Sequence, residues 1–248
     1  MNFGGKVALI TGATSGIGEV TATLLARHGA HVLVSGRDQQ RGNRVVETIR
    51  AAGGSADFLS AALVDAQGCR ALAAAASEIA GRVDILINNA AVGTFGRTEK
   101  IAETDFDYCY AVNVKAPFYL VGALAPAMAA RGDGVIVNVS TMVASFGTAG
   151  SAVYASSKAA LNHLTKCWAA EYGPRGVRVN AVAPGPTLTD NAVAQFGEDG
   201  LAQMMSHAPA RRAAAPHEIA SAIAFLASDE ARFVHGAILP ADGGRSAS

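Results

Sequence analysis

The alternation of two kinds of segment along the chain is the feature that most constrains its fold. Short runs rich in valine, isoleucine and leucine alternate with longer, alanine-rich amphipathic runs. The strand candidates read KVALIT, HVLVS, SADFLS, VDILIN, GVIVNVS, VRVNAVA and GAILPA, and helix candidates lie near residues 17–28, 38–52, 66–80, 103–130, 152–173 and 216–228. The strands are apolar on both faces, as in a sheet covered by helices on both sides. This order predicts a parallel, doubly wound α/β sheet with right-handed crossovers, in a single domain over residues 1–248.

One segment interrupts the alternation. Between AVAPGPT and APHEIA lie about thirty residues without a strand pattern, a length that compact domains usually reserve for lids or binding loops. Because open α/β sheets bind ligands at the carboxyl ends of their strands, we expect a substrate lid near residues 186–214. The alternative is a helical insertion on the surface.

Charge and cysteine content exclude several function classes. The chain has 20 basic and 20 acidic residues, so its formal net charge is zero, which argues against binding to nucleic acid or to an anionic membrane. Three scattered cysteines, Cys69, Cys109 and Cys167, form neither a disulfide framework nor a metal-ligand spacing, and the six histidines form no metal pattern. We therefore expect a reducing environment and no metal.

The ends and apolar runs of the sequence bear on location. The N-terminal MNFGGKVALIT lacks the apolar stretch of a signal peptide. The longest apolar run, residues 118–130, is shorter than the roughly 20 residues that span a bilayer, and Pro126 interrupts it. A soluble, cytoplasmic protein is the expectation.

A glycine-rich turn follows the first strand. In ITGATSGIGE, residues 10–19, three glycines (Gly12, Gly16 and Gly18) permit a tight turn into a helix, whose N-terminus offers free N–H groups to a pyrophosphate. No lysine follows the last glycine, so this is not a nucleoside-triphosphate P-loop.

The second strand candidate ends in GRD, without the acid that often holds the adenosine ribose. Arg37 stands there instead, just before a helix whose N-cap is expected at Asp38. A cation is unfavourable at a helix N-terminus, so helix stability does not explain Arg37, whereas a 2′-phosphate does. The residue favours NADP over NAD, and NAD stays the alternative.

The run YASSK places Tyr154 and Lys158 four residues apart, on one face of a helix. A tyrosine with its ordinary pKa of about 10 is a poor base near neutrality. A nearby ammonium and an oxidised, positively charged nicotinamide both favour the phenolate, so we expect them to lower that pKa.

Further stretches, ILINNAA at 85–91, YAVNVKA at 110–116 and VIVNVSTMVA at 135–144, complete a pattern with TGATSGIG and YASSK. Together these resemble the short-chain dehydrogenase/reductase family, of the type that opens with TGxxxGxG and carries YxxxK. The resemblance covers nearly the whole chain. It implies a Rossmann-like, three-layer α/β/α fold with seven parallel strands, a nicotinamide cofactor, and a homotetramer or homodimer.

The same resemblance implies site residues. Tyr154 matches the catalytic acid/base, Lys158 its partner, Ser140 the substrate-polarising hydroxyl and Asn113 the residue that holds a proton-relay water. Tyr154 and Lys158 also count among the cofactor contacts, together with Gly12, Ser15, Gly16, Ile17, Gly18, Arg37, Leu63, Asn89, Ala90, Pro184, Gly185, Thr187 and Thr189.

Three positions depart from the family pattern. Ala91 stands where many members have glycine, and Ala62 where many carry an aspartate that contacts adenine. Ser15 replaces the basic residue that many NADP-using members carry in the glycine loop, which leaves Arg37 as the main contact for a 2′-phosphate.

These features predict an NADP(H)-dependent oxidoreductase that interconverts a small-molecule ketone and a secondary alcohol. The residues expected on the substrate side are mostly apolar and favour an apolar or acyl-bearing ketone: Phe95, Met142, Val143, Phe146, Met204 and Met205. One alternative is reduction of a 3-oxoacyl thioester on an acyl carrier protein. A second is a dinucleotide-binding sensor without turnover.

Overall fold

A parallel sheet of seven strands runs through the computed structural model, which describes residues 1–247. The strands are β1 (Val7–Thr11), β2 (His31–Gly36), β3 (Ser55–Ser60), β4 (Ile85–Asn88), β5 (Gly134–Val139), β6 (Val177–Pro184) and β7 (Ile238–Ala241). Their order across the sheet is β3-β2-β1-β4-β5-β6-β7, and every neighbouring pair is parallel. The predicted doubly wound, Rossmann-like sheet is confirmed.

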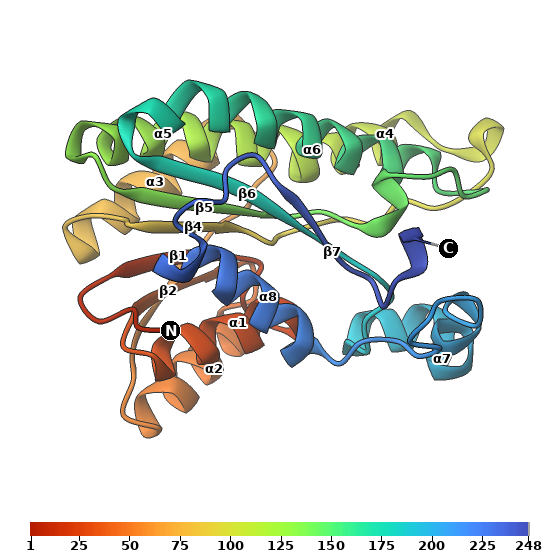
Figure 1. Cartoon of the computed structure of the whole chain (residues 1–248), viewed down its shortest axis with the longest axis horizontal. Coiled ribbons are helices and arrows are strands. Elements are labelled where there is room, and N and C mark those ends of the chain that lie inside the picture. The colour runs from red at the N-terminus through yellow and green to blue at the C-terminus, as the bar shows by residue number, and fades with distance from the viewer. Residues whose placement is uncertain (248) are drawn as a thin grey trace.

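Helices cover both faces of the sheet (Figure 1). One layer contains α1 (Gly16–Arg27), α2 (Gln39–Ala51) and α8 (Pro216–Ala227), and the other contains α3 (Ala66–Ala80), α4 (Glu103–Tyr110), α5 (Ala116–Arg131) and α6 (Ala152–Tyr172). Helix α7 (Asp190–Met204) lies outside both layers, at the edge where the strands end. The arrangement is the expected three-layer α/β/α fold.

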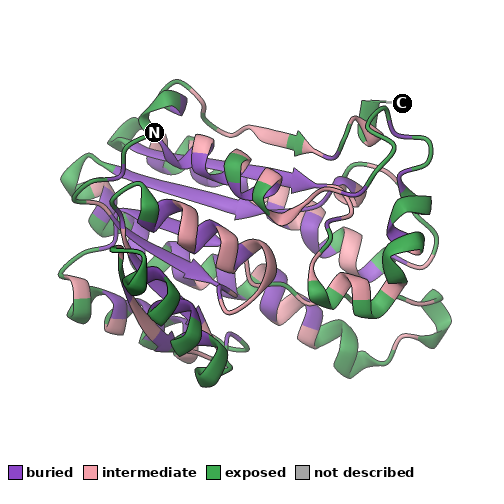
Figure 2. Cartoon of the chain, turned by 90° about the horizontal axis from the view of Figure 1, so that it is seen from below, coloured by how far each residue is buried: buried purple, intermediate pink, exposed green. Residues whose placement is uncertain are grey.

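Each strand contributes to a core on either side of the sheet, because successive side chains point to opposite faces. Leu9 and Leu33 pack toward α3 and α5, while Ala8 and Ile10 pack toward α1 and α2. Strands β5 and β6 are buried along their whole length, as the purple central strands of Figure 2 show. This double burial explains why the strand sequences are continuous apolar runs.

The strand order reverses between β1 and β4. From β1 the chain crosses to β2 and β3 on one side, and it continues from β4 to β5, β6 and β7 on the other. The turn after β1 and the segment after β4 therefore meet at the carboxyl edge, where open α/β sheets bind their ligands.

The helix expected over residues 103–130 has an irregular centre. A π-helical turn, Ala111–Lys115, separates α4 from α5. By length and composition alone, the stretch Glu103–Arg131 could cross a membrane. An 18-residue window within it has a mean hydropathy of 1.2, but 56% of that window is buried inside the fold. A core helix of a globular domain has the same properties.

The two ends of the segment predicted as a lid, residues 186–214, are paired with each other. Thr187 and Ala214 form a single parallel bridge, with hydrogen bonds from Leu188 N to Ala214 O and from Ala214 N to Pro186 O, each 2.8 Å. Between these ends lies α7, whose axis bends at Gly197, where φ is 69° and ψ is 159°.

Candidate active site and cofactor cleft

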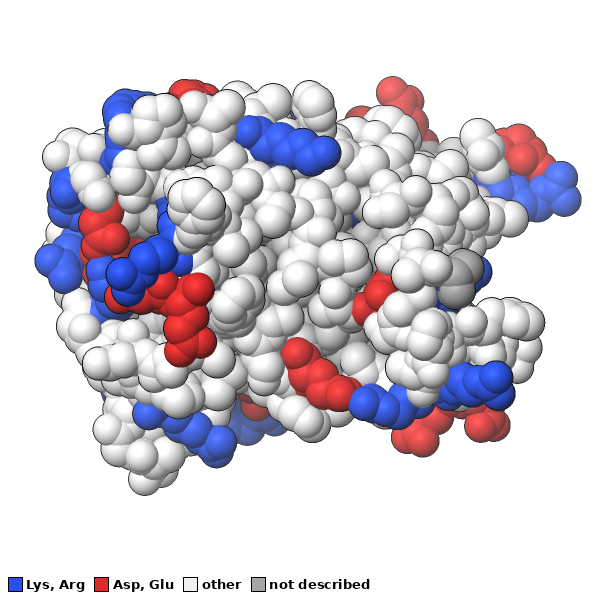
Figure 3. Space-filling view, viewed as in Figure 1, with Lys and Arg blue, Asp and Glu red and all other residues white. Residues whose placement is uncertain are grey.

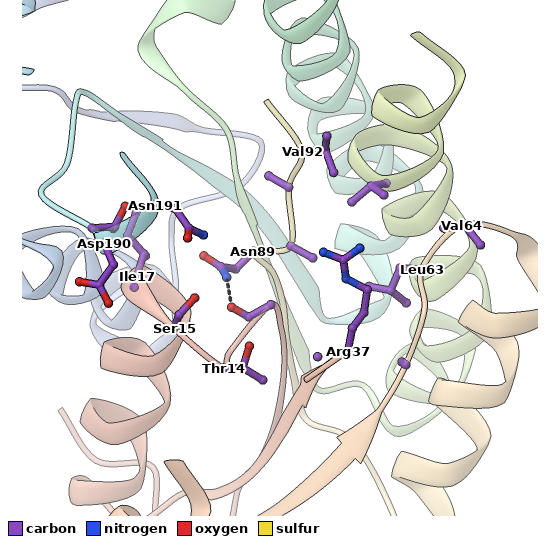
Figure 4. A pocket seen from close by; sticks show the side chains of 18 of the residues that line it. Thr14, Ser15, Ile17, Arg37, Leu63, Val64, Asn89, Val92, Asp190 and Asn191 are labelled. Carbon is purple, nitrogen blue, oxygen red and sulfur yellow. Dashed lines mark hydrogen bonds between the residues drawn. The ribbon is translucent and has the colours of Figure 1, made fainter. Parts of the chain in front are cut away.

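A cleft of about 340 Å³ lies at the carboxyl edge of the sheet, over the reversal point between β1 and β4. Figure 4 shows its side chains, which come from the turn after β1, the end of β2, the segments after β3 and β4, and the start of α7. Nine residues predicted to contact the cofactor line it: Gly12, Ser15, Gly16, Ile17, Arg37, Leu63, Asn89, Ala90 and Thr189.

The glycine turn brings its backbone close to the segment after β4, while Thr14, Ser15 and Ile17 line the cleft. Gly12 has φ of 63°, and a Cβ on it would lie 2.8 Å from the Ala90 Cα. A Cβ on Gly18 would overlap the Gly12 carbonyl oxygen, so Gly18 acts through close packing at the start of α1 rather than by lining the cleft. This open cradle at a helix N-terminus fits a dinucleotide pyrophosphate.

Asn89 ties the two sides of the reversal point together. Its Nδ2 donates to Thr11 O at 2.9 Å and to Gly12 O at 3.0 Å, the second bond being drawn in Figure 4. The buried Thr11 hydroxyl accepts from the backbone N–H groups of Asn89 and Ala90, both at 3.1 Å. These bonds hold the glycine turn against the segment after β4, so the Asn-Asn-Ala sequence has a structural role beside any cofactor contact.

Arg37 extends across one end of the cleft. Its Nη1 donates to the Tyr108 hydroxyl of α4 at 2.7 Å, and both residues line the cleft with Leu63 and the 40%-exposed Val64. Asp38 caps α2 by accepting from Arg41 N at 3.0 Å, as predicted. Sequence analysis did not predict Tyr108 and Val64 as cleft residues, because both are distant in sequence from the end of β2.

The other predicted cofactor residues border the cleft without lining it. Pro184 ends β6. Gly185 packs against Asp242, and the Thr187 hydroxyl donates to Gly185 O at 3.0 Å. This segment leads into α7, whose N-cap, Thr189, lies against Gly16 and accepts from Ala192 N at 3.3 Å.

Tyr154 and Lys158 lie on α6, close to the segment after β4. The Tyr154 side chain is half-buried, and the Thr141 side chain lies close enough to its hydroxyl to favour the phenolate. Burial raises the pKa of Tyr154 to about 12, and the Thr141 side chain only partly opposes that rise. The expected lowering is thus not found in the ligand-free protein, because the cost of a buried phenolate outweighs the local stabilisation.

The residue predicted to supply the substrate-polarising hydroxyl is Ser140. It follows β5, is 3% exposed, and its Oγ has no hydrogen-bond partner among the described residues. The adjacent residue, Thr141, supplies the hydroxyl that meets Tyr154.

Lys158 is buried to 1% exposure and donates from Nζ to Val139 O at 2.7 Å. Burial lowers the pKa of its ammonium to about 8. A buried amine that keeps a charge needs polar partners, and here the carbonyl at the end of β5 provides one.

Asn113 lies in the π turn and is completely buried. Its Oδ1 accepts from Val92 N at 2.8 Å, while Nδ2 donates to Val92 O at 2.9 Å and to Ser157 Oγ at 3.0 Å. The Ser157 hydroxyl in turn donates to Tyr154 O at 2.7 Å. The amide therefore joins the segment after β4 to α6, and its own polar atoms are already engaged.

Comparisons with known proteins agree with this geometry. A family model described as enoyl-(acyl carrier protein) reductase matches residues 12–246. An uncharacterised oxidoreductase of Thermotoga maritima is 42% identical, with 100% of both chains covered. A solved structure described as a short chain dehydrogenase/reductase family protein is 44% identical over 100% of both chains, with a TM-score of 0.91. The chain belongs to the short-chain dehydrogenase/reductase family.

Another similar protein was solved with a nicotinamide cofactor bound. It is a 7α-hydroxysteroid dehydrogenase complexed with NADH and 7-oxo glycochenodeoxycholic acid, 38% identical, with a TM-score of 0.92 over 98% of this chain and 95% of the relative. As a short-chain dehydrogenase/reductase, the present protein is an NAD(P)-dependent oxidoreductase that binds a nicotinamide dinucleotide and acts on small molecules.

The apolar residues predicted on the substrate side occupy different surroundings in this dehydrogenase/reductase. Phe95 packs on the Tyr154 ring, and Phe146 lies under the Arg245 guanidinium at 5.2 Å. Met142 and Val143 follow Thr141 in a short helical turn. The two methionines of the lid differ, since Met205 is buried and Met204 is exposed.

Proposed function

We propose that this protein catalyses the NADP(H)-dependent interconversion of a ketone and a secondary alcohol, with Tyr154 as the general acid/base. One observation carries the proposal: Tyr154 lies one helical turn from the buried Lys158, with the Thr141 side chain beside its hydroxyl. This combination provides a proton donor, a second hydroxyl and a cation at one place.

When bound, the nicotinamide supplies a hydride to the carbonyl carbon or accepts one from the alcohol. In reduction, Tyr154 gives its hydroxyl proton to the carbonyl oxygen, which becomes the alcohol oxygen, and a phenolate remains. In oxidation the phenolate removes that proton. A raised pKa keeps the tyrosine protonated at neutral pH and so ready for reduction. We infer that the positive charge of the oxidised cofactor lowers this pKa when alcohol is oxidised.

The hydroxyl that polarises the carbonyl is proposed to be that of Thr141, with Ser140 as the alternative from the family pattern. Lys158 is proposed to hold the nicotinamide ribose and to return a proton toward Tyr154. Because the Asn113 side chain is engaged by Val92 and Ser157, a relay water is proposed to bind the backbone of the π turn instead.

The cofactor is proposed to be NADP(H). Support comes from Arg37 at the cleft end, from Gly36 in place of an acid, and from Leu63 and Val64 as an apolar wall for adenine. Gly12, Ser15, Gly16 and Ile17 would hold the pyrophosphate, and Asn89, Ala90, Pro184, Gly185, Thr187 and Thr189 would border the riboses and nicotinamide. NAD(H) stays the alternative, since the hydroxysteroid dehydrogenase relative holds NADH.

The substrate lid is proposed to be the segment 186–214, whose ends are joined through Thr187 and Ala214 and which is also bonded to the loop after β7, from Ala210 N to Gly243 O at 3.0 Å. Its helix begins at the cleft and carries Phe196 toward the substrate side. A hinge at such an attachment would let α7 move while the sheet stays fixed.

Assembly is proposed to be a homotetramer, with a homodimer as the alternative. An apolar groove of about 530 Å³ between α4 and α6 and the exposed rings of Phe106 and Phe118 support this. The free thiols of Cys69, Cys109 and Cys167 agree with a reducing, cytoplasmic location.

Reduction of a 3-oxoacyl thioester is the second candidate, because a relative from Thermotoga maritima that is 36% identical over 98% of this chain is described as a 3-oxoacyl-[acyl-carrier-protein] reductase. The test compares NADPH consumption with a free ketone and with an acetoacetyl thioester, using NADH as the cofactor control and Tyr154→Phe as the protein control. We expect turnover of the free ketone with NADPH, and its loss in Tyr154→Phe. Turnover of the thioester alone would support the second candidate. Tight NADPH binding with no turnover of either compound, unaffected by Tyr154→Phe, would point to a sensor.

A further inference from the structure

We propose that Phe95 and Phe196 form an aromatic subsite for a carbocyclic ring beside Tyr154, so that the substrate is an uncharged cyclic ketone or the corresponding alcohol. This inference rests on the proposed ketone–alcohol activity and names its substrate class.

The three rings form a continuous series. The Phe95 and Tyr154 ring centroids are 5.2 Å apart, with the planes inclined at 51°. The Phe95 and Phe196 centroids are 5.8 Å apart, in an edge-to-face arrangement at 80°. Phe95 thus lies between the catalytic phenol and the lid, and a ring that packs on it is held next to the hydroxyls of Tyr154 and Thr141.

The segment carrying Phe95 is shaped for this position. A Cβ on Gly93 would lie 2.6 Å from the Phe95 ring, so only glycine lets the ring fold back over its own backbone. Gly96 N donates to Gly150 O at 2.8 Å, which joins this segment to the loop before α6. On the lid, Phe196 directly precedes the bend at Gly197. Both aromatic side chains are therefore held by local backbone features.

The exposure of Phe95 leaves room for a ligand contact. Its side chain is 41% exposed although it touches two other rings. Burying such an aromatic surface against an apolar ring is favourable, and ring stacking adds directional preference. A rigid ring also loses less conformational entropy on binding than a linear chain, whose rotatable bonds must be frozen.

The charges of the lid disfavour the alternative substrate. Helix α7 carries Asp190, Glu198 and Asp199 and has neither lysine nor arginine. At the far end of the segment, outside this helix, Arg212 is engaged by Glu218 through two bonds of 2.7 and 2.6 Å, and the adjacent Arg211 is exposed. An acidic helix repels the phosphates of a coenzyme A thioester or an acidic carrier protein, whereas it has no such effect on a neutral ring.

The test measures kcat and KM with NADPH for a substituted cyclohexanone and for an acyclic ketone of the same carbon number. Wild type, Phe95→Ala and Phe196→Ala are compared with Phe233→Ala, a control at an exposed ring in the loop between α8 and β7, on the opposite edge of the sheet. We expect kcat/KM for the cyclic ketone to fall about tenfold in the two subsite variants, chiefly through KM, as for one lost aromatic contact. Values for the acyclic ketone and for Phe233→Ala should change less than about threefold.

The other outcomes would contradict either the ring subsite or the proposed ketone–alcohol activity. If the subsite variants lose activity equally on both ketones, or if wild type prefers the acyclic ketone, the ring subsite is wrong while the ketone–alcohol activity stands. If wild type reduces neither ketone but turns over the thioester, the proposed function fails and the subsite with it. Should Phe95→Ala fail to fold, Phe95→Leu keeps the apolar bulk and removes only the aromatic face, and it must show the same selective loss.

Discussion

Two hydroxyl residues follow β5, and the side chain of the second lies beside the hydroxyl of Tyr154, the proposed acid/base. Ser140 is buried without a partner among the described residues, whereas Thr141 meets the Tyr154 hydroxyl. If Thr141 stabilises the developing alkoxide, Thr141→Ala should lower kcat about 10²- to 10³-fold, as removal of one such donor does elsewhere. Ser140→Ala should lower it less than about threefold.

Steady-state reduction of the preferred ketone checks this ranking, with Thr141→Ser as the matched control that keeps the hydroxyl and should keep most activity. The reverse ranking would return the role to Ser140. Sequence analysis chose Ser140 from the family pattern, which does not show which of two adjacent hydroxyl side chains faces Tyr154. The strand stops at Val139, and the direction of each following side chain depends on that stop.

The buried ammonium of Lys158 should make folding stability depend on pH. Its pKa is lowered to about 8 in the folded protein and is 10.5 ordinarily. Below pH 8 the amine is charged in both states, so the burial cost is fully present. Between 8 and 10.5 the folded protein releases the proton first, and stability rises with pH as that cost is relieved.

Lys158→Met removes this cost, so at pH 7 the variant should be more stable than wild type by about 1–3 kcal/mol. The advantage should shrink toward pH 10, although activity is lost throughout. Urea unfolding at both pH values measures it. Lys166→Met, at an exposed position on the same helix, should show no such dependence. An advantage that grows with pH would contradict the buried-charge assignment.

At the scale of elements, local patterns predicted most of the fold. All seven strand candidates form strands. Strands β1, β4, β5 and β6 are buried along their whole length, which favours apolar runs, whereas the edge strands β3 and β7 are only partly buried. The glycine turn could also be predicted, because a side chain at Gly12 or Gly18 would clash with neighbouring atoms. All six predicted helices are present. The helix expected over residues 103–130 is interrupted, and α7 was predicted only as a lid or a surface insertion.

The features that escaped prediction depend on partners distant in sequence. The π turn is held by Asn113, whose partners Val92 and Ser157 lie 21 and 44 residues away. Arg178, buried in β6, donates to the carbonyls at the end of α8, including Leu226 O at 2.8 Å and Ser228 O at 2.9 Å. Tyr108 meets Arg37 across the cleft over 71 residues. Periodicity describes one helix at a time, so it could not supply these contacts.

At the scale of the whole molecule, charges of both signs are dispersed over the face shown in Figure 3. Figure 3 shows lysine and arginine beside aspartate and glutamate in small groups of both signs, separated by wide uncharged areas. Long-range electrostatic capture of a charged macromolecule is therefore not favoured on this face. Association through apolar contacts fits this surface better.

The layer of α4, α5 and α6 offers such a contact. Phe106 on α4 is 43% exposed and Phe118 on α5 is 49% exposed, with Phe118 packed at 6.3 Å from the Trp168 ring of α6. If this face joins subunits, light scattering of wild type should give four times the mass of one chain, or twice it for a dimer. Phe118→Asp should shift the mass downward, because an unpaired carboxylate in an apolar interface is costly to bury.

Ile79→Asp, at a 49%-exposed position on α3, should leave the mass unchanged. A monomeric wild type, or an assembly indifferent to Phe118→Asp but broken by Ile79→Asp, would show that subunits do not meet through this face.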